Sequence, residues 1–387
     1  MVKKILIVHN NYQNTGGEDL AVTNEVALLK QDYIVDTLFF SNKIDNYLST
    51  IFWLIFGTNK QSVNKLQKKI EEFQPDIAYV HNTWFRASIG IIDTLNKQNI
   101  KTVVKLHNFR YFCTKTFFSK NHFKDKNFCG ACGLERESMG FINKYFKESF
   151  LKSIIVLRYG RKYYRLLQKS NFKILVLTNF HKKFLINLGV DDKRIFILPN
   201  HLNLDDKYEE KFKNTNQDDY IVYAGRISKE KGIESLIEAF LKSDIASMKL
   251  KIIGDGPARK DLKFKFQNNN IEFIGELSNS ETLNIIKFSK AVVTSTKLYE
   301  GQPNLLCEAS ILKVPSIFPS SGGIKEFFPP SYNLCFEQFN YDDLIEKLNL
   351  IKSTKEMDKI SNDNKEYIAN TLSERKILDK FKRVIDG

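Results

Sequence analysis

Two glutamates separated by a proline stand out among the residues that could do chemistry. The stretch Tyr299–Glu308 reads YEGQPNLLCE and places Glu300 and Glu308 eight residues apart. Pro303 has a preset helical φ and no N–H, so we expect it at the first position of a helix. Glu300 then lies in the loop before this helix, and Glu308 lies in its second turn. On spacing alone, two solvated glutamates that flank a helix are the better explanation.

The segment before these glutamates predicts where they lie. Residues 290–296, KAVVTST, form a strand-like run, so both carboxylates are expected at the carboxyl end of a strand. Ligands bind at that edge of open α/β sheets, partly because the start of a helix offers free N–H groups to anions. The stretch therefore predicts a ligand site.

A second motif places two cations after another strand-like run. Residues 224–232, AGRISKEKG, open a helix and contain Gly225, Arg226 and Lys231. Gly225 allows a close backbone turn, and a bidentate guanidinium with a compact ammonium makes a suitable diphosphate clamp. Charged loops that open helices also occur on solvated faces, so the motif alone leaves both interpretations open.

Two further strand-end turns are rich in glycine. Residues 254–257 read GDGP and residues 320–326 read SSGGIKE. The first permits close backbone approach, although by itself it also fits an ordinary tight turn. In the second, Gly322 and Gly323 can present N–H groups to an anion. Together with the two motifs above, four successive strand ends carry ligand-compatible chemistry, which favours one shared site.

The first half of the chain offers weaker signals. Gly16 and Gly17 lie in NTGGED between the first strand and the first helix, but their spacing is not that of a dinucleotide-binding fingerprint. The acids that follow them, Glu18 and Asp19, are favourable at a helix start by themselves. Lone histidines are more often structural than catalytic. Three of them end strand-like runs: His9, His81 and His107.

A cysteine-containing loop follows the run that ends at His107. It holds Cys113, Cys129 and Cys132, and His122 is the histidine within it. The last two cysteines have C-x2-C spacing, which is suggestive of zinc, but a tetrahedral site needs a fourth ligand. We therefore expect no metal and three free thiols in a packed loop, with a structural zinc site as the alternative.

Charge favours an anionic partner. The 387 residues include 59 Lys and Arg against 45 Asp and Glu, a net charge of +14, which suits nucleic acid, an anionic lipid surface or a phosphorylated small molecule. Residues 141–169 interleave aromatic and basic side chains. This pattern fits a helix on an anionic membrane or an amphipathic helix that packs on its own sheet. No nucleic-acid-binding motif accompanies the charge, so we expect no nucleic acid.

Strand-like runs alternate with helical segments along the chain, which predicts doubly wound parallel sheets of the α/β class. The length predicts two domains. We place an amino-terminal domain at residues 1–203, a polar linker at 204–219 and a carboxyl-terminal domain at 220–372. The strand-like runs are residues 4–9, 33–40, 76–81, 101–107, 173–178, 194–199, 220–225, 248–254, 271–275, 290–295 and 314–318.

The chain start, MVKKILIVHNN, lacks a long apolar core and a cleavage site, so it predicts a strand and not a signal peptide. The most apolar stretch, residues 47–56, has about half the length of a spanning helix. We therefore expect a cytoplasmic protein whose cysteines are reduced.

Taken in order, several of these segments resemble a known family. AGRISKEKGIESLIEAF, KLKIIGDGP, IEFIGELS, YEGQPNLLCEAS and SSGGIKEFF are similar to the carboxyl-terminal domain of family 4 retaining glycosyltransferases of the GT-B fold. HNNYQNTGGEDLAVTNEVALLK, PDIAYVHN, KLHNFRYFC and LTNFHKKFL resemble the branch that builds bacterial surface polysaccharides of capsule and O-antigen type. The resemblance covers most of residues 1–335. It implies two Rossmann-like domains facing across a cleft, with the last helix, residues 373–387, packing back on the first domain.

The resemblance also implies roles for single residues. Arg226 and Lys231 match the pair that holds the donor diphosphate, Glu308 matches the glutamate on the ribose hydroxyls, and Glu300 and His107 match residues beside the donor sugar. The implied catalytic set is His107, Glu300, Arg226 and Lys231. The implied donor-binding set is Gly16, Gly17, Gly225, Arg226, Lys231, Gly254, Gly301, Gln302, Pro303, Asn304, Leu305 and Glu308. Many relatives have Gly-Phe-Gly after the first glutamate where this chain has Gly301-Gln302-Pro303, so contacts to the sugar are expected to differ.

The implied activity is that of a metal-independent, retaining, hexosyltransferase-type glycosyltransferase that needs no cofactor beyond its UDP-, GDP- or ADP-sugar donor. The implied acceptor is a lipid-linked saccharide, which the enzyme would bind at the inner face of the cytoplasmic membrane. Two alternatives remain open: another nucleotide-sugar enzyme such as an epimerase, or a transferase acting on nucleic acid; and a non-catalytic polysaccharide-assembly subunit that keeps only the fold. The complete set of Arg226, Lys231, Glu300 and Glu308 argues against a non-catalytic copy.

Overall fold

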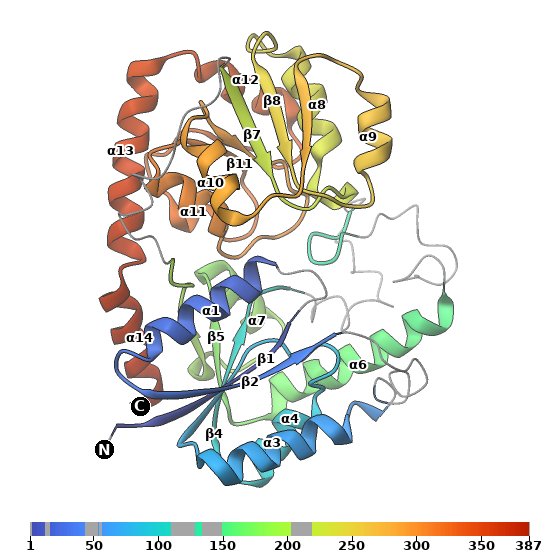
Figure 1. Ribbon diagram of the computed structural model, residues 1–387, viewed down its shortest axis with the longest axis vertical. Coiled ribbons are helices and arrows are strands. Elements are labelled where there is room, and N and C mark those ends of the chain that lie inside the picture. The colour runs from blue at the N-terminus through green and yellow to red at the C-terminus, as the bar shows by residue number, and fades with distance from the viewer. Residues whose placement is uncertain are drawn as a thin grey trace. The chain divides into compact units, whose positions relative to one another are not determined.

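The chain folds into two compact α/β units. The computed structural model describes residues 2–11, 16–42, 53, 56–109, 128–133, 149–202 and 219–386. The first unit comprises Met1–His201 and Glu374–Gly387, and the second comprises Leu202–Ser373 (Figure 1). The linker expected at residues 204–219 lies outside the described residues except for Asp219.

The first unit is built on a parallel sheet with the strand order β2-β1-β3-β4-β5-β6. Its strands are β1 (Lys4–Asn11), β2 (Ile34–Ser41), β3 (Ile77–Val80), β4 (Lys101–Leu106), β5 (Lys173–Val176) and β6 (Ile195–Ile197). The described helices around it are α1 (Gly17–Leu29), α3 (Lys60–Phe73), α4 (Gly90–Lys97), α6 (Phe150–Lys169), α7 (Asn179–Asn187) and α14 (Glu374–Asp386). The central strands are apolar runs because both faces of a parallel sheet are covered by helices.

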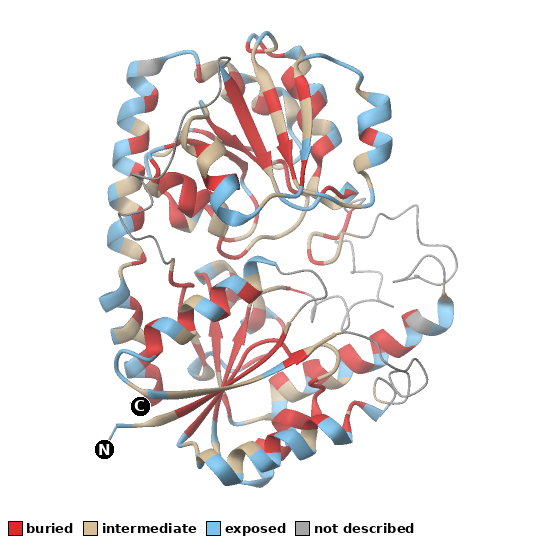
Figure 2. Ribbon diagram, in the orientation of Figure 1, coloured by how far each residue is buried: buried red, intermediate tan, exposed pale blue. Residues whose placement is uncertain are grey.

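The second unit repeats this architecture with the strand order β12-β11-β10-β7-β8-β9. Its strands are β7 (Tyr220–Ala224), β8 (Lys249–Ile253), β9 (Ile271–Gly275), β10 (Val292–Val293), β11 (Ser316–Pro319) and β12 (Cys335–Phe336). Its described α-helices are α8 (Ile233–Lys242), α9 (Arg259–Lys265), α10 (Asn279–Lys287), α11 (Asn304–Ile311), α12 (Tyr341–Leu350) and α13 (Thr354–Thr371). Buried residues form an apolar cluster on each face of this sheet, and Figure 2 colours the buried positions of its strands and helices red.

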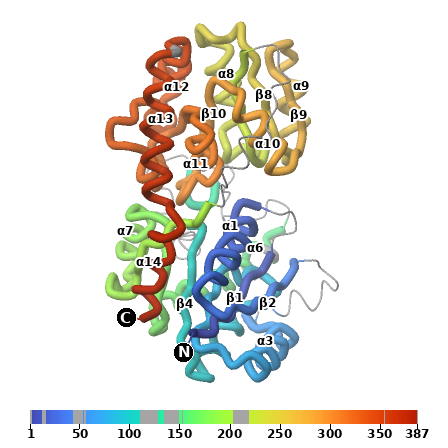
Figure 3. The backbone as a smooth tube through the Cα atoms, turned by 60° about the vertical axis from the view of Figure 1, so that its left-hand side comes forward, coloured from blue at the N-terminus to red at the C-terminus, as the bar shows by residue number. Residues whose placement is uncertain are grey.

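The last helix belongs to the first unit. Ile377, Phe381 and Ile385 of α14 are buried against apolar residues of α1 and the sheet, and Figure 3 shows α14 in red beside the amino-terminal elements. The Phe381 ring lies 5.1 Å from that of Tyr79 in β3 and 6.0 Å from that of Tyr33. The amphipathic spacing of these residues therefore lets one face of α14 pack on the core of the first unit, which is formed by residues far away in the sequence.

The fold class expected from the sequence is confirmed: both units are Rossmann-like parallel sheets of six strands each in the described residues. In each sheet the order in which successive strands are added reverses at one point, between β1 and β3 in the first unit and between β7 and β10 in the second. Such switch points are where open α/β sheets bind ligands, because the loops leave in opposite directions there. Among the described helices, none combines the length and hydrophobicity that a membrane crossing requires.

Candidate functional site

The second unit gathers the sequence-predicted motifs at its switch point. The loops with Arg226, Gly254, Glu300 and Gly322 follow β7, β8, β10 and β11, which are consecutive neighbours in the sheet order. Because the strands are parallel, all four loops leave from the same edge. The structure therefore brings the four strand-end motifs of the second unit together.

The position of Pro303 differs by one residue from the expectation. Pro303 is the residue before the helix, with ψ 78°, and α11 begins at Asn304. The Pro303 carbonyl accepts the first intrahelical hydrogen bond, from the Cys307 N–H at 3.0 Å. A residue that caps a helix has a non-helical ψ, although its carbonyl accepts the first hydrogen bond of the helix. Like the first helical position, the cap position needs no backbone N–H, so proline suits it. Glu300 still lies in the loop and Glu308 in the second turn of α11.

Lys231 and Glu300 form an ion pair in this site. Lys231 Nζ lies 2.6 Å from Glu300 Oε1, and the Thr296 hydroxyl donates to the same oxygen at 3.0 Å. The Glu300 carbonyl accepts the Gly323 N–H at 2.8 Å, which ties the loop after β10 to the loop after β11. Both charged side chains are about one quarter exposed, so the ammonium keeps donors for an incoming anion.

The backbone of Arg226 is fixed by a hydrogen bond, whereas its guanidinium is exposed to solvent. The buried Tyr223 hydroxyl donates to the Arg226 carbonyl at 2.9 Å. Burial raises the pKa of Tyr223 well above its ordinary value, and the charges of Glu300 and Glu230 add to this effect. The Arg226 side chain is exposed, and its guanidinium makes no hydrogen bond or ion pair with another described residue. It can therefore bind an anion without first leaving a partner.

Two glycines are required by close backbone contacts. Gly254 has φ 125°, and a Cβ there would lie 2.1 Å from the Gly225 carbonyl oxygen. Gly322 has φ 62°, and a Cβ there would lie 2.2 Å from the Glu300 carbonyl oxygen. These contacts are below any tolerable separation, and both φ values are in the region that L side chains rarely adopt. The glycines therefore allow the four loops to pack against one another.

Glu308 is a buried acid. Its side chain is on α11 and only 8% of the residue is exposed. Burial raises the pKa of Glu308 to about 7, against a smaller opposing effect of a hydrogen bond with the Asn279 side chain. A carboxyl group with such a pKa changes charge near neutrality, so a ligand that donates hydrogen bonds to the carboxylate would favour its ionised form.

The residues between the two glutamates form the entrance to α11. Gly301 and Gln302 are buried, and Pro303, Asn304 and Leu305 are partly exposed. The Gln302 carbonyl accepts the Asn304 N–H at 3.1 Å. This tight turn places the helix start between Glu300 and Glu308, as the spacing predicts.

Gly16 and Gly17 lie in the first unit, at the start of α1. Gly17 is its first residue, and the Gly16 N–H donates to Asp19 Oδ2 at 2.8 Å. The other Asp19 oxygen lies 2.8 Å from His9 Nε2. Asp19 therefore both caps α1 and fixes a buried histidine at the end of β1.

His107 follows β4 in the first unit and is paired with another histidine. Its Nε2 lies 3.1 Å from Nδ1 of His81, which follows β3, and the two rings stack at 5.4 Å. Burial lowers the pKa of both rings well below the ordinary value, and the nearby Lys105 charge adds to this effect. Both histidines are therefore neutral near pH 7.

The expected cysteine loop is described only at residues 128–133. Cys129 is buried and Cys132 is partly buried. Cys113 and His122 lie outside the described residues. Within the part of the chain that the structure describes, no group of three or more acidic, histidine or cysteine side chains could hold a metal ion.

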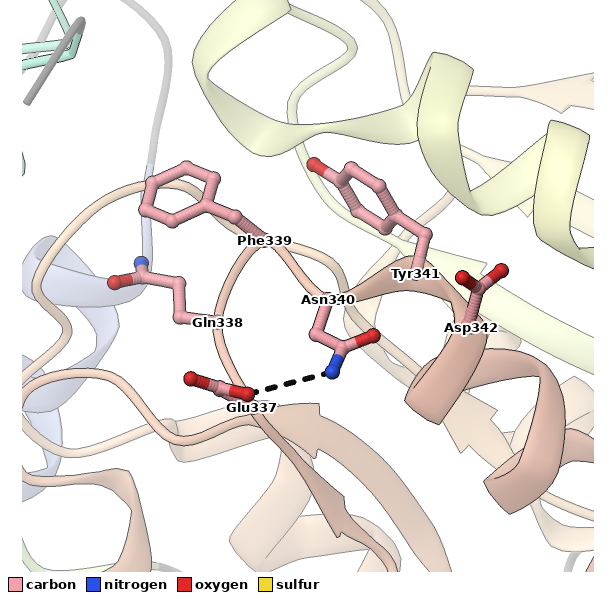
Figure 4. Close-up of a pocket in the computed structure, with 6 residues that line it drawn as sticks. All are labelled: Glu337, Gln338, Phe339, Asn340, Tyr341 and Asp342. Carbon is pink, nitrogen blue, oxygen red and sulfur yellow. Dashed lines mark hydrogen bonds between the residues drawn. The ribbon is translucent and has the colours of Figure 1, made fainter.

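Three site residues were missed at the sequence level: Thr296, Ser321 and Gln338. The Gln338 amide donates to Ser321 Oγ at 2.8 Å, and Ser321 Oγ donates to the Leu298 carbonyl at 2.8 Å. Gln338 also belongs to a pocket after β12, at the same edge of the sheet, which is drawn in Figure 4 and lined by Glu337, Gln338, Phe339, Asn340, Tyr341 and Asp342. Thr296 and Ser321 lie at or just after strand-like runs, which is a weak signal, and Gln338 follows β12, for which the sequence analysis names no run.

Comparisons with known proteins agree with this geometry. Residues 205–367 match the protein family described as glycosyl transferases group 1. An uncharacterized glycosyltransferase of Methanocaldococcus jannaschii is 28% identical over 287 residues, and the match spans 70% of this chain but only 62% of that protein. The amylovoran biosynthesis glycosyltransferase AmsD of Erwinia amylovora is 22% identical over 322 residues, 81% of this chain and 80% of AmsD. The Anabaena protein HepE, solved in complex with UDP and glucose, has a TM-score of 0.70 at 12% identity over 99% of both chains.

The two parallel-sheet units and these similarities define a protein of the GT-B fold. The residues that match the glycosyl transferases group 1 family, 205–367, lie in its second unit and include Arg226, Lys231, Glu300 and Glu308.

Proposed function

We propose that this chain transfers a sugar from a nucleotide-diphosphate sugar to a saccharide acceptor, with retention at the anomeric carbon. The observation that carries the proposal is the arrangement at the switch point of the second unit: an exposed Arg226, a Lys231 oriented by Glu300, and a buried Glu308 on the adjoining helix. The similarity to HepE, which was solved with UDP and glucose, and to AmsD supports the same activity.

Each group has a chemical task in this reaction. Arg226 and Lys231 bind the diphosphate and stabilise the charge that develops on it as the bond from the anomeric carbon to the phosphate oxygen breaks. The acceptor hydroxyl forms the new bond to that carbon on the same face, and its proton passes to the departing diphosphate. Glu308 accepts hydrogen bonds from the ribose hydroxyls. Glu300 orients Lys231 through the 2.6 Å ion pair and lies beside the sugar.

The proposed reaction needs no metal, because two cationic side chains supply the positive charge on the diphosphate. Transfer should therefore proceed unchanged after treatment with EDTA. A loss of activity that added Mg²⁺ or Mn²⁺ restores would show that the clamp is insufficient by itself.

The test of the donor site is nucleotide binding followed by transfer. UDP, GDP or ADP at a hundred times its dissociation constant should stabilise the folded protein by about 2.7 kcal/mol, which a thermal melt detects. Arg226→Ala should lower the transfer rate by roughly a hundredfold, whereas Lys229→Ala in the same loop should not, because the exposed Lys229 is not part of the clamp. Conversion of the sugar nucleotide without an acceptor would indicate an epimerase, and no binding of any nucleotide would indicate a non-catalytic subunit.

The acceptor is proposed to be lipid-linked and met at an anionic membrane surface, in the synthesis of a cell-surface polysaccharide. Helix α6 has a buried face and an outer face that begins with apolar side chains, of which Leu151 is 65% exposed and Phe150 and Ile154 are 40% exposed. The outer face continues with exposed basic residues, Arg158, Arg161, Arg165 and Lys169. Apolar residues that enter the lipid boundary next to a basic stripe suit an anionic surface.

Vesicle sedimentation tests this contact. The protein should sediment with phosphatidylglycerol vesicles and not with phosphatidylcholine vesicles. Each basic residue near such a surface contributes about 1 kcal/mol, so Arg158→Gln with Arg165→Gln should weaken binding roughly thirtyfold. The matched control is Lys355→Gln with Lys359→Gln, two exposed cations of α13. If the α6 and α13 double variants weakened binding equally, net charge alone and not this face of α6 would account for the binding.

A further inference from the structure

A buried ionic cluster lies beneath the strand ends of the first unit. Glu25 of α1 and Lys105 of β4 form an ion pair in which the two side chains are 3% and 0% exposed. The Tyr79 hydroxyl of β3 donates to Glu25 Oε2 at 3.1 Å. Burying two charges costs several kcal/mol per ion, and replacing such a pair by apolar residues is often neutral or stabilising. A role in stability alone is therefore a weak explanation for this cluster.

The cluster continues through His81 to His107, at the carboxyl end of β4 in the same unit. His81 Nε2 faces Glu25 Oε2 at 3.6 Å, and it makes no hydrogen bond with a described residue. On the other edge of the same ring, His81 Nδ1 lies 3.1 Å from His107 Nε2. The order of groups is thus Lys105, Glu25, His81 and His107, from the buried interior to the half-buried end of β4.

The charge of Glu25 decides which nitrogen carries the proton in each ring. If His81 Nδ1 donated to His107, the unprotonated Nε2 of a neutral His81 would point its lone pair at a carboxylate. If His107 Nε2 donates to His81 Nδ1, the His81 Nε2–H points at that carboxylate, which is favourable. In neutral imidazole one nitrogen donates and the other accepts. The second arrangement therefore leaves His107 Nδ1 without a proton.

We propose that Glu25 and His81 are positioning residues that hold His107 neutral, with its proton on Nε2 and a lone pair on Nδ1, so that His107 accepts a hydrogen bond from a sugar hydroxyl. The proposal rests on the proposed transfer reaction. Lys105 has a separate task, since its charge offsets that of Glu25 and removes the incentive for His81 to take up a proton. His107 then orients a hydroxyl and does not act as an acid.

The surrounding charges agree with a neutral pair. Besides burial, the groups that lower the pKa of His107 are Lys105, His9 and His181, and His81 is affected by His107, Lys105 and His9. His9 itself contacts Asp19, and burial lowers its pKa despite that carboxylate. Burial raises the pKa of Tyr79 well above its ordinary value, so it stays a donor to Glu25.

The protonation state can be read directly by NMR. Long-range ¹H–¹⁵N spectra distinguish the two nitrogens of each imidazole, and the chain has only 6 histidines; His107→Gln and His81→Gln assign the two signals. The expected result is a protonated Nε2 and an unprotonated Nδ1 on His107, with no titration between pH 5.5 and 8. A protonated Nδ1, or a ring that titrates near pH 6.5, would overturn the proposal.

Activity gives a second, independent measurement. The charge-neutral double variant Glu25→Gln/Lys105→Met removes the carboxylate without leaving a buried charge unpaired. Misplacing a substrate group typically costs about a hundredfold, so kcat should fall between about tenfold and a hundredfold while KM for the donor and binding of the nucleoside diphosphate stay unchanged. Tyr79→Phe is the matched control, because it removes a bond to Glu25 but leaves the contact with His81; its kcat should stay within about twofold.

The outcomes separate this proposal from the proposed function. If the natural protein binds a nucleotide and transfers sugar but the double variant keeps its kcat, the positioning role is wrong and the function stands. If the natural protein neither binds a nucleotide nor transfers, the proposed function fails first. If the double variant does not fold, as judged by circular dichroism, the NMR measurement on the natural protein decides alone.

Discussion

Glu308→Gln should remove the pH dependence that Glu308 gives to the stability of the second unit. Burial raises the pKa of Glu308 from its ordinary value of 4.5 to about 7. A carboxyl group with a raised pKa in the folded state contributes stability that is fully present below pH 4.5 and is lost as the pH rises through 7. The difference between these pKa values corresponds to about 3 kcal/mol, and most of the loss falls between pH 5 and pH 8. The neutral amide has no such dependence.

The measurement must report on the second unit. Both tryptophans, Trp53 and Trp84, lie in the first unit, so fluorescence is unsuitable, and hydrogen exchange of peptides from β7, β10 and α11 is the better readout. Without ligand, Glu308→Gln should gain up to about 3 kcal/mol over the natural protein at pH 8 and much less at pH 5. The control Glu276→Gln, at an exposed position, should show no such difference. An equal gain at both pH values would refute the reasoning.

Two further predictions concern the same site. Gly254→Ala should destabilise the second unit by about 2 kcal/mol or more, because the added Cβ would meet the Gly225 carbonyl at 2.1 Å; urea unfolding monitored by circular dichroism measures this, and Gly16→Ala is the control, since its Cβ would have 4.0 Å of space. A mild effect of Gly254→Ala would mean that the loops can separate. Thr296→Val should lower the transfer rate roughly tenfold, because a hydrogen bond to a charged group contributes about 1.5 to 3 kcal/mol and this one holds Glu300 at 3.0 Å. Thr294→Val at the same strand end should leave the rate unchanged, and an equal loss from both would point to the strand and not to Glu300.

Much of the fold could be predicted from local patterns. Apolar runs such as residues 4–9 and 220–225 became β1 and β7 because a strand covered on both faces needs a continuous apolar sequence. Helix bounds were less exact. Pro303 is the capping residue before α11 and not its first residue. Proline suits both positions, because neither requires a backbone N–H. Local sequence does not distinguish the two positions.

The candidate site was predicted unevenly. The motifs with Arg226, Lys231, Glu300 and Glu308 are each ambiguous alone and gain weight from their order along the chain; the structure places Arg226, Lys231 and Glu300 in loops at neighbouring strand ends and Glu308 on the adjoining α11. Thr296 and Gln338 were missed because single polar residues after strands are common. The buried pair Glu25–Lys105 was also missed, since a lone glutamate in a helix and a lone lysine in a strand give no sign that they meet.

The sequence by itself predicted most of the secondary elements and the strand-end loops that carry Arg226, Lys231 and Glu300, because turn chemistry, helix starts and charge act over a few neighbouring positions. The tertiary structure decided strand order, the Lys231–Glu300 ion pair across 69 residues and the contact between Glu25 and His81. Burial and hydrogen bonding depend on which segments the parallel sheet brings side by side, and no local pattern encodes that choice. The charge of Glu308 and the neutrality of His107 follow from this packing.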